Sequence, residues 1–262
     1  MKLLIQSDDY GITEGVACGI IKGIKDGVIR NTGMFANMPS TAKAAEMIRD
    51  LKEVCVGIDL NFVAGKPVAN VPSLVKENGY LYDSRERRRL DKECGGDHLA
   101  PYYEEVKAEG RAQIERFIEL MGRKPEYLHG HAYGCPTISR VHQELGEEYG
   151  IGLTMKMLED NGAKQCKSWY TVPFSEEDQK KVNTTKHITT DQGELLGHEI
   201  GAIVSHCGYI DAPLYSLTSF TVIRTKDLEC MVSDEMKQWI KDNQIELITY
   251  RDLDHNPQKS QK

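Results

Sequence analysis

The sequence predicts an α/β fold built on a parallel β-sheet. Apolar, strand-like runs alternate with helical patterns, so that strand, helix, strand, helix and strand follow one another within the first 60 residues. Several of the apolar runs end in a carboxylate or an imidazole, as expected where a parallel sheet presents a binding site at the carboxyl ends of its strands. At 262 residues, 40% of them apolar, the chain can form one large α/β domain or two small ones.

The first five elements have the clearest patterns. A buried strand ends in the acidic pair Asp8 and Asp9, and apolar residues at helical spacing then stop at Gly27. Ser40, after a proline, is a plausible N-cap for the second helix. We expect these strands and helices, in chain order, at residues 3–9, 13–26, 28–37, 40–51 and 54–60.

Residues 61–100 interrupt this alternation with glycines and prolines, and a segment of this kind inside a domain is usually functional or mobile. It contains four arginines, which fit either a solvated helix face or an anion site for a phosphorylated substrate: Arg85, Arg87, Arg88 and Arg89. Further helices are expected at 103–121, 137–149 and 226–242, and further strands at 127–131, 152–155, 200–208 and 246–249. The polar segment 158–195 allows no assignment. We expect one catalytic domain over residues 1–253 and a polar, disordered tail over 254–262.

Composition narrows the functional classes. A formal charge of −7 and a pI near 5.7 argue against a nucleic-acid partner. No apolar run approaches the length of a membrane span, and the first residues lack a signal-peptide pattern, so we expect a cytoplasmic protein. Seven scattered cysteines without a CxxC motif favour reduced thiols over disulfides or a thiolate metal site.

Polar residues at the ends of apolar strands form the candidate site: Asp8, Asp9, Asp59, His129, His131 and His206. Two histidines that are two residues apart on a strand face the same side. A parallel barrel gathers its strand ends in one pocket, where carboxylates and imidazoles without thiolates suit zinc, magnesium or manganese. Metal-assisted hydrolysis is the matching reaction class. The alternative for the acidic pair is a turn that caps the helix beginning near Thr13, and the stretch itself favours neither interpretation.

A set of motifs in a specific order resembles the YdjC-like carbohydrate deacetylases, which include chitooligosaccharide deacetylases. In the first half of the chain these are Asp8-Asp9-Tyr10-Gly11, Thr32-Gly33-Met34-Phe35-Ala36-Asn37-Met38-Pro39, Gly57-Ile58-Asp59-Leu60-Asn61 and Gly65-Lys66-Pro67. Later come Gln113-Ile114-Glu115-Arg116-Phe117, Gly122-Arg123-Lys124-Pro125, Ser205-His206-Cys207-Gly208-Tyr209-Ile210-Asp211 and residues 245–253. The similarity runs from residue 3 to about 253 and is weakest between 158 and 198.

The resemblance implies a single-domain, distorted TIM-like (β/α) barrel of the glycoside hydrolase and deacetylase type. It implies the metal-dependent removal of N-acetyl groups from N-acetylglucosamine-containing oligosaccharides, such as chitobiose or its phosphate, and a homodimer. By residue, it implies Asp8 as the general base, Asp9 and His131 as metal ligands and His206 as the general acid. It places Arg224, Asn37 and Asn61 beside the substrate or the ligands, and we expect Arg224 to brace Asp8 or to form a surface ion pair.

Two positions depart from the family pattern. Asp59 stands where the family has a histidine ligand, and His129 stands where it has an aspartate. We expect one divalent ion bound by Asp9, Asp59 and His131, with His129 as a fourth ligand or as a donor that holds Asp59. The more anionic site favours Mg²⁺ or Mn²⁺ over Zn²⁺. The alternative is a site that has lost its metal. A smaller departure, Cys207 in place of a proline, bears only on the placement of His206.

The expected mechanism has a metal-bound water as nucleophile, with Asp8 removing its proton and His206 protonating the leaving amine. Two alternatives belong to other classes. Asp8 and Asp59 could act as paired carboxylates in a metal-independent glycoside hydrolase acting on a phospho-disaccharide. A barrel without catalysis could serve as a sugar-binding sensor.

Overall fold

The computed structural model describes residues 1–170 and 175–254, and its centre is a curled, wholly parallel sheet of eight strands. The strands are β1 (Lys2–Tyr10), β2 (Asn31–Met34), β3 (Cys55–Leu60), β4 (Tyr127–Gly130), β5 (Gly152–Leu153), β6 (Lys164–Gln165), β7 (Ile200–Ser205) and β8 (Glu246–Ile248). Their order is β5-β4-β3-β2-β1-β7-β6, with β8 also paired to β1. Among the described residues no pairing joins β5 to β6, so the sheet forms a half-barrel.

Strand β1 lies at the middle of the sheet because it pairs with three strands. Its first half pairs with β8, its second half pairs with β2, and β7 follows its other edge for six residues. The Asn31 side chain joins the strands on the β2 side, where its amide donates to the carbonyl oxygens of Ile5 and Ile248. The apolar run at the N-terminus is therefore covered on both edges.

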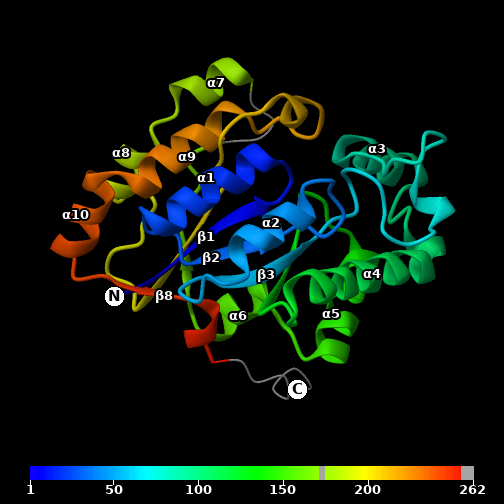
Figure 1. Cartoon of the computed structure of the whole chain (residues 1–262), viewed down its shortest axis with the longest axis horizontal. Coiled ribbons are helices and arrows are strands. Elements are labelled where there is room, and N and C mark those ends of the chain that lie inside the picture. The colour runs from blue at the N-terminus through cyan, green and yellow to red at the C-terminus, as the bar shows by residue number, and fades with distance from the viewer. Residues whose placement is uncertain (171–174, 255–262) are drawn as a thin grey trace.

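Helices cover the sheet, as Figure 1 shows for α1 and α2 against β1 to β3. They are α1 (Glu14–Lys25), α2 (Thr41–Ile48), α3 (Ser84–Cys94), α4 (Tyr103–Met121), α5 (Pro136–Tyr149), α6 (Thr154–Asp160), α7 (Glu176–Lys181), α8 (Thr184–Thr189), α9 (Val222–Val232) and α10 (Asp234–Asp242). Short 3₁₀ turns are η1 (Pro72–Leu74), η2 (Ala100–Tyr102), η3 (Ala212–Ser216) and η4 (Tyr250–Asp252). No helix in the described ranges is long and apolar enough to cross a membrane.

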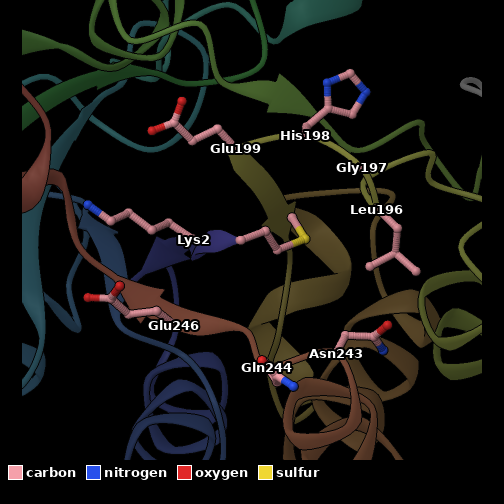
Figure 2. Close-up of a pocket in the computed structure, with 9 residues that line it drawn as sticks. Lys2, Leu196, Gly197, His198, Glu199, Asn243, Gln244 and Glu246 are labelled. Carbon is pink, nitrogen blue, oxygen red and sulfur yellow. The ribbon is translucent and has the colours of Figure 1, made fainter.

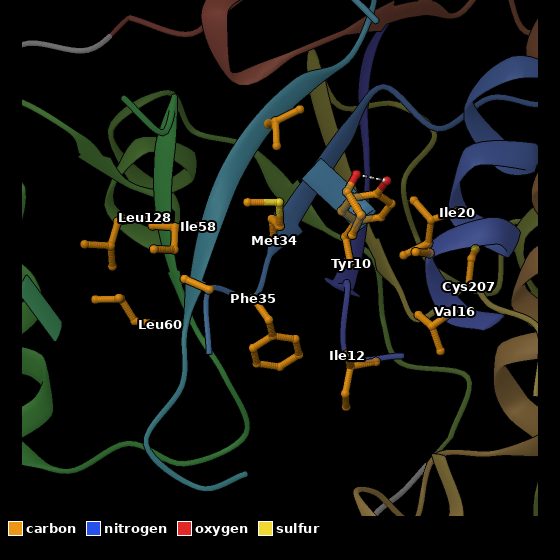
Figure 3. Packing of buried hydrophobic residues seen from close by; sticks show 14 of the residues in the cluster. Tyr10, Ile12, Val16, Ile20, Met34, Phe35, Ile58, Leu60, Leu128 and Cys207 are labelled. Atoms are coloured by element: carbon orange, nitrogen blue, oxygen red, sulfur yellow. Dashed lines mark hydrogen bonds between the residues drawn. The ribbon is translucent and has the colours of Figure 1, made fainter. Parts of the chain in front are cut away.

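Two apolar cores follow from the alternation of side chains along the strands. The larger core lies between the sheet and the helices; in it Tyr10 packs between α1 residues such as Val16 and strand residues such as Met34 (Figure 3). The smaller core fills the inner face of the curled sheet and includes Leu4, Cys55, Tyr127, Ala202 and Ile248. Every second residue of a strand faces the same side, so the residues that follow this core toward the carboxyl ends of the strands also face the inside of the curled sheet.

The expected parallel α/β fold is confirmed, with differences at three places. The strand expected at 152–155 is only Gly152–Leu153, because α6 begins at Thr154. The single helix expected at 226–242 is wrong: Ser233 is extended and caps α10, which separates α9 from α10. Ser40 stands at the N-cap of α2, but its hydroxyl donates to the Gly11 carbonyl instead of accepting from α2. The expected disordered tail lies, beyond Asp254, outside the described residues.

The arginine-rich segment forms α3, which protrudes beside the end of α4 (Figure 1). Arg87 is buried and donates to the carbonyl oxygens of Phe62 and Leu74, so it holds the loop that follows β3. Arg88 is exposed and donates to the Ala132 carbonyl, next to His131. The expectation of a solvated helix face is confirmed for the exposed arginines and wrong for Arg87.

Candidate active site at the carboxyl ends of the strands

Four of the predicted site residues lie on the inner face of the sheet, at or just beyond the carboxyl ends of its strands. Asp8 lies two residues beyond Gln6 on the inner side of β1, and Asp59 and His129 are register partners on β3 and β4. His206 directly follows β7, whose Ser205 pairs with Ser7 of β1. Because parallel strands end at one edge of the sheet, four side chains from four strands meet above the apolar inner core.

A bulge in β1 explains how two adjacent aspartates both contribute. The register between β1 and β2 shifts between Ser7 and Tyr10, and Asp9 has a positive φ of 68°. A non-glycine residue in this region of backbone space is uncommon and is often held at functional sites. The bulge places the Asp9 amide 2.8 Å from Asp59 Oδ2, to which it donates. Adjacent strand residues would otherwise face opposite sides of the sheet.

Asp9 is 1% exposed and lies between the side chains of Arg224 and His131. Arg224 Nη2 donates to its Oδ2 at 2.6 Å, and His131 Nδ1 lies 2.8 Å from its Oδ1, outside hydrogen-bond geometry. Burial alone would raise the pKa of Asp9, but the charges of His131 and Arg224 outweigh burial and hold this pKa well below its usual range. Arg224 is fully buried and contacts Asp9, so both expectations for it, that it braces Asp8 or forms a surface pair, are wrong.

Asp8 is held by two neighbours on the inner face. The Gln6 amide donates to its Oδ1, and His129 Nε2 lies 3.4 Å from its Oδ2. Burial opposes ionisation of Asp8, but the His129 charge outweighs it and lowers the pKa of Asp8. Burial likewise opposes protonation of His129, yet Asp8 raises the His129 pKa to about 9. The Thr154 hydroxyl, 2.7 Å from His129 Nδ1, completes the imidazole's hydrogen bonding.

Asp59 is the least compensated carboxylate of the cluster. It is fully buried, and its Oδ1 accepts no hydrogen bond from the described residues. Burial and the nearby Asp8 charge raise its pKa to about 7. Its carboxylate lies over Gly33 of β2, where an added Cβ would be only 1.7 Å from Asp59 Oδ1. The glycine of β2 therefore makes the space that the aspartate occupies.

The His206 side chain lies among aromatic residues. Its ring contacts Phe220 at a centroid distance of 4.9 Å, and its Nδ1 lies 3.2 Å from the Tyr170 hydroxyl. Its backbone amide donates to Asp227 Oδ2 at 2.9 Å. Burial lowers the pKa of His206, and the charges of Asp9 and Asp8 offset only part of this effect.

Asn37 and Asn61 organise the loop after β3 and have no described contact with the cluster. Asn61 Nδ2 donates to Asn37 Oδ1 and to the Ala64 carbonyl, while its Oδ1 accepts from the Val63 and Ala64 amides. A substrate contact by either asparagine stays a prediction. Sequence reasoning missed Gln6, Thr154, Tyr170 and Asp227, which contact the site residues. Of these four residues, only Gln6 could have been found from the sequence, because it lies two residues before Asp8 on the same strand and therefore faces the same side.

The site contains the types of atom that bind divalent cations, namely carboxylate oxygens and an imidazole nitrogen. Asp9 Oδ1 and Asp59 Oδ1 are buried carboxylate oxygens without a hydrogen-bond donor in the described residues, and His131 adds a nitrogen beside Asp9. Asp59 Oδ1 has neither a hydrogen bond nor an ion pair with the described residues, and a buried carboxylate oxygen of this kind calls for a cation. No three His, Cys, Asp or Glu side chains within residues 1–170 and 175–254 form a ready-made metal site.

A separate open pocket lies at the opposite end of the sheet. Figure 2 shows the charged side chains of Lys2, Glu199 and Glu246 at this pocket, near the amino ends of β1, β7 and β8. None of its lining residues carries one of the buried, unpaired polar atoms found in the described chain. This pocket contains none of the predicted site residues, which lie at the carboxyl ends of the strands.

Comparisons with known proteins agree with the resemblance seen in the sequence. Carbohydrate deacetylase 2 of Listeria innocua is 28% identical over 260 residues, covering 97% of this chain and 99% of the relative. A carbohydrate deacetylase of Brevibacillus brevis is 30% identical over 259 residues, covering 97% of this chain and all of the relative.

One similar crystal structure, from Enterococcus faecalis, carries the provisional name cellobiose-phosphate cleavage protein. It has a TM-score of 0.76 and 25% sequence identity, and the match covers 95% of this chain and 97% of that one. A family model described as YdjC-like protein matches residues 2–242. The chain therefore belongs to the YdjC-like protein family.

Proposed function

We propose that this protein is a metal-dependent carbohydrate deacetylase that removes N-acetyl groups from N-acetylglucosamine-containing oligosaccharides. The observation that carries the proposal is the presence of an ionised Asp8 and of His206 at the same edge of the sheet, in a chain that matches carbohydrate deacetylases over 97% of its length. Hydrolysis of an amide needs a base for the attacking water and an acid for the leaving amine, and these two residues supply them.

Asp9, Asp59 and His131 are the residues that would hold the divalent ion. A bound ion would supply a Lewis acid that polarises the acetyl carbonyl group. Two of these residues offer buried oxygens without a donor, which supports the assignment. Two carboxylates and one imidazole favour Mg²⁺ or Mn²⁺ over Zn²⁺.

The step assigned to Asp8 follows from its charge, and the step assigned to His206 follows from its position at the same edge of the sheet. Asp8, kept ionised by His129, accepts a proton from water as the water oxygen bonds to the carbonyl carbon. His206 donates a proton to the nitrogen as the carbon–nitrogen bond breaks. The products are acetate and the free amine, so one water is consumed for each acetyl group. Arg224 keeps Asp9 ionised and in place.

A second function has one specific observation in its favour. The similar Enterococcus faecalis structure is named for cleavage of a phosphorylated disaccharide. In that alternative Asp8 and Asp59 would act on the glycosidic bond as paired carboxylates. The elevated pKa of Asp59, about 7, beside the low pKa of Asp8 gives the acid and base that such cleavage needs.

The test is to incubate the purified protein with chitobiose or chitobiose phosphate and to measure acetate and new reducing ends separately. With added Mg²⁺ or Mn²⁺ we expect acetate, no new reducing ends, and loss of activity on chelation. Reducing ends that form in the presence of chelator would support glycosidic cleavage, and tight sugar binding without either product would support a sensor. Light scattering on the same sample tests the homodimer that the family resemblance implies.

A further inference from the structure

One buried carboxylate, Asp227 of α9, joins three segments around His206. It is fully buried; its Oδ2 accepts the His206 amide, and its Oδ1 accepts the Trp169 indole N–H and the Thr184 hydroxyl, each at 2.9 Å. A carboxylate removed from water in this way is stabilised only while such donors stay in place. Burial raises its pKa to about 6, and the three donors limit the rise.

Tyr170 connects the hydrogen bonds of Asp227 to the imidazole ring of His206. It directly follows Trp169, and its hydroxyl lies 3.2 Å from His206 Nδ1. Phe220 packs edge-on against both rings, at 5.2 Å from Tyr170 and 4.9 Å from His206. Burial raises the pKa of the Tyr170 hydroxyl, so this group stays neutral and can either donate to Nδ1 or accept from it.

We propose that Asp227 and Tyr170 are the positioning residues of His206. Asp227 fixes the backbone of His206 and, through Trp169, the place of Tyr170, whose hydroxyl fixes the ring through Nδ1. The proposal rests on the proposed function, in which His206 protonates the leaving amine. With Nδ1 engaged by Tyr170, Nε2 is the nitrogen that remains to exchange a proton with substrate.

The hydroxyl also affects how readily His206 holds its proton. A hydrogen bond to a charged imidazolium is stronger than one to a neutral imidazole, so the Tyr170 contact favours the protonated form. The other charged groups that bear on His206 are Asp8 and Asp9, which favour protonation, and Arg224 and His131, which oppose it. The contact between Asp227 and His206 is to the backbone amide of His206 and not to its imidazole. Replacing Tyr170 by phenylalanine should therefore lower the His206 pKa.

The first test is an NMR titration of the His206 imidazole in the intact protein, assigned by comparison with His206→Gln. For Tyr170→Phe we expect the His206 midpoint to fall by about half a unit to one unit, because the lost hydrogen bond is stronger to the charged imidazolium than to the neutral imidazole. The alkaline limb of kcat/KM should move by the same amount. Tyr10→Phe is the matched control, because it removes a buried hydroxyl that donates to Ala44 in the outer core. An unchanged His206 midpoint in Tyr170→Phe would overturn the proposal.

The second test separates positioning from support of the fold. Asp227→Asn replaces one of the two acceptor oxygens by an NH2 donor, so either His206 or Trp169 and Thr184 lose their acceptor. Thr184→Val removes one donor to the same carboxylate and leaves the contacts of His206 and Trp169 in place. We expect kcat to fall about tenfold or more in Asp227→Asn with little change in KM, and less than threefold in Thr184→Val. Equal losses in the two variants would mean a purely structural role.

If Asp227→Asn does not fold, Trp169→Phe removes the link to Tyr170 instead. Absence of acetate release by the wild type would refute the proposed function, while the NMR titration would still decide the role of Tyr170.

Discussion

Asp59 and His129 face each other across the β3–β4 pair as register partners. The resemblance seen in the sequence implies a histidine and an aspartate at these positions, and here one carboxylate and one imidazole also stand on neighbouring strands. Here the imidazole pairs with Asp8 and is held by Thr154, while the carboxylate keeps an oxygen free. We interpret this as a compensated exchange, in which either residue alone would be misplaced.

A reciprocal exchange tests this compensation. We expect Asp59→His and His129→Asp each to lose most Mg²⁺ or Mn²⁺ binding and about a hundredfold or more of the activity, because each leaves two like residues side by side. The double variant should recover to within about tenfold of the wild type. Isothermal titration with the metal gives a measurement independent of turnover. A double variant as impaired as the single ones would show that the two positions are not coupled.

The raised pKa of Asp59 gives a prediction for stability. A native-state pKa of about 7 against an ordinary value near 3.8 means that the folded protein holds this proton more tightly than the unfolded chain. Its contribution to stability is therefore present at low pH and is lost as the pH rises from about 4 to 7. Without divalent metal at pH 8, Asp59→Asn should be more stable than the wild type by about 1–3 kcal/mol in urea unfolding.

Added Mg²⁺ or Mn²⁺ should reverse that order, since only the wild type keeps the carboxylate that binds the ion. The matched measurement at pH 4.5 should show little difference between the two proteins. If the metal stabilises both proteins equally, Asp59 is not a ligand.

Strand β2 leaves room for the Asp59 carboxylate because it has a glycine, Gly33, beside it. Gly33 pairs with Gly57 of β3, and an added Cβ at Gly33 would overlap the Asp59 carboxylate. Gly33→Ala should therefore displace Asp59 and abolish most metal binding and activity. Gly134→Ala is the control, because an added Cβ there meets nothing within 4 Å. Normal activity in Gly33→Ala would contradict the placement of Asp59.

Helix α9 is tied to β1 through the buried pair of Arg224 and Asp9. Arg224→Met would leave the Asp9 carboxylate buried with less compensation, and breaking such a pair costs about 3–5 kcal/mol. We expect a loss of that size in the free energy of unfolding from urea titration. The double variant Arg224→Met/Asp9→Asn should recover part of it. A single variant as stable as the wild type would show that the pair does not hold the helix.

Most long elements were predictable because their periodicity is local. The helix at 103–121 was expected with the bounds that it has, and its end at Gly122 follows from a left-handed C-cap. The two-residue strands β5 and β6 are too short to show any period, and β6 exists only through its pairing with β7. The break at Ser233 was missed because apolar spacing continues across it, while the serine caps the next helix.

At the scale of the whole molecule, a curled parallel sheet brings residues 8, 59, 129 and 206 together. Their position at strand ends made the cluster predictable from sequence. The partners of these residues were not predictable, because they depend on the bulge at Asp9 and on the way α9 crosses the end of the sheet. Asp227 and Tyr170 lie on a helix and a loop without any sequence pattern that points to His206.

Acetate release from chitobiose by the wild type and by Asp8→Asn, with Mg²⁺ or Mn²⁺ present, tests whether Asp8 is the base of a metal-dependent deacetylation. The substitution is nearly isosteric, but an amide cannot accept the proton of the attacking water. We predict metal-dependent acetate release by the wild type and a loss of about a hundredfold or more in the variant. No acetate from the wild type with any of these metals, or equal rates in the two proteins, would contradict the account.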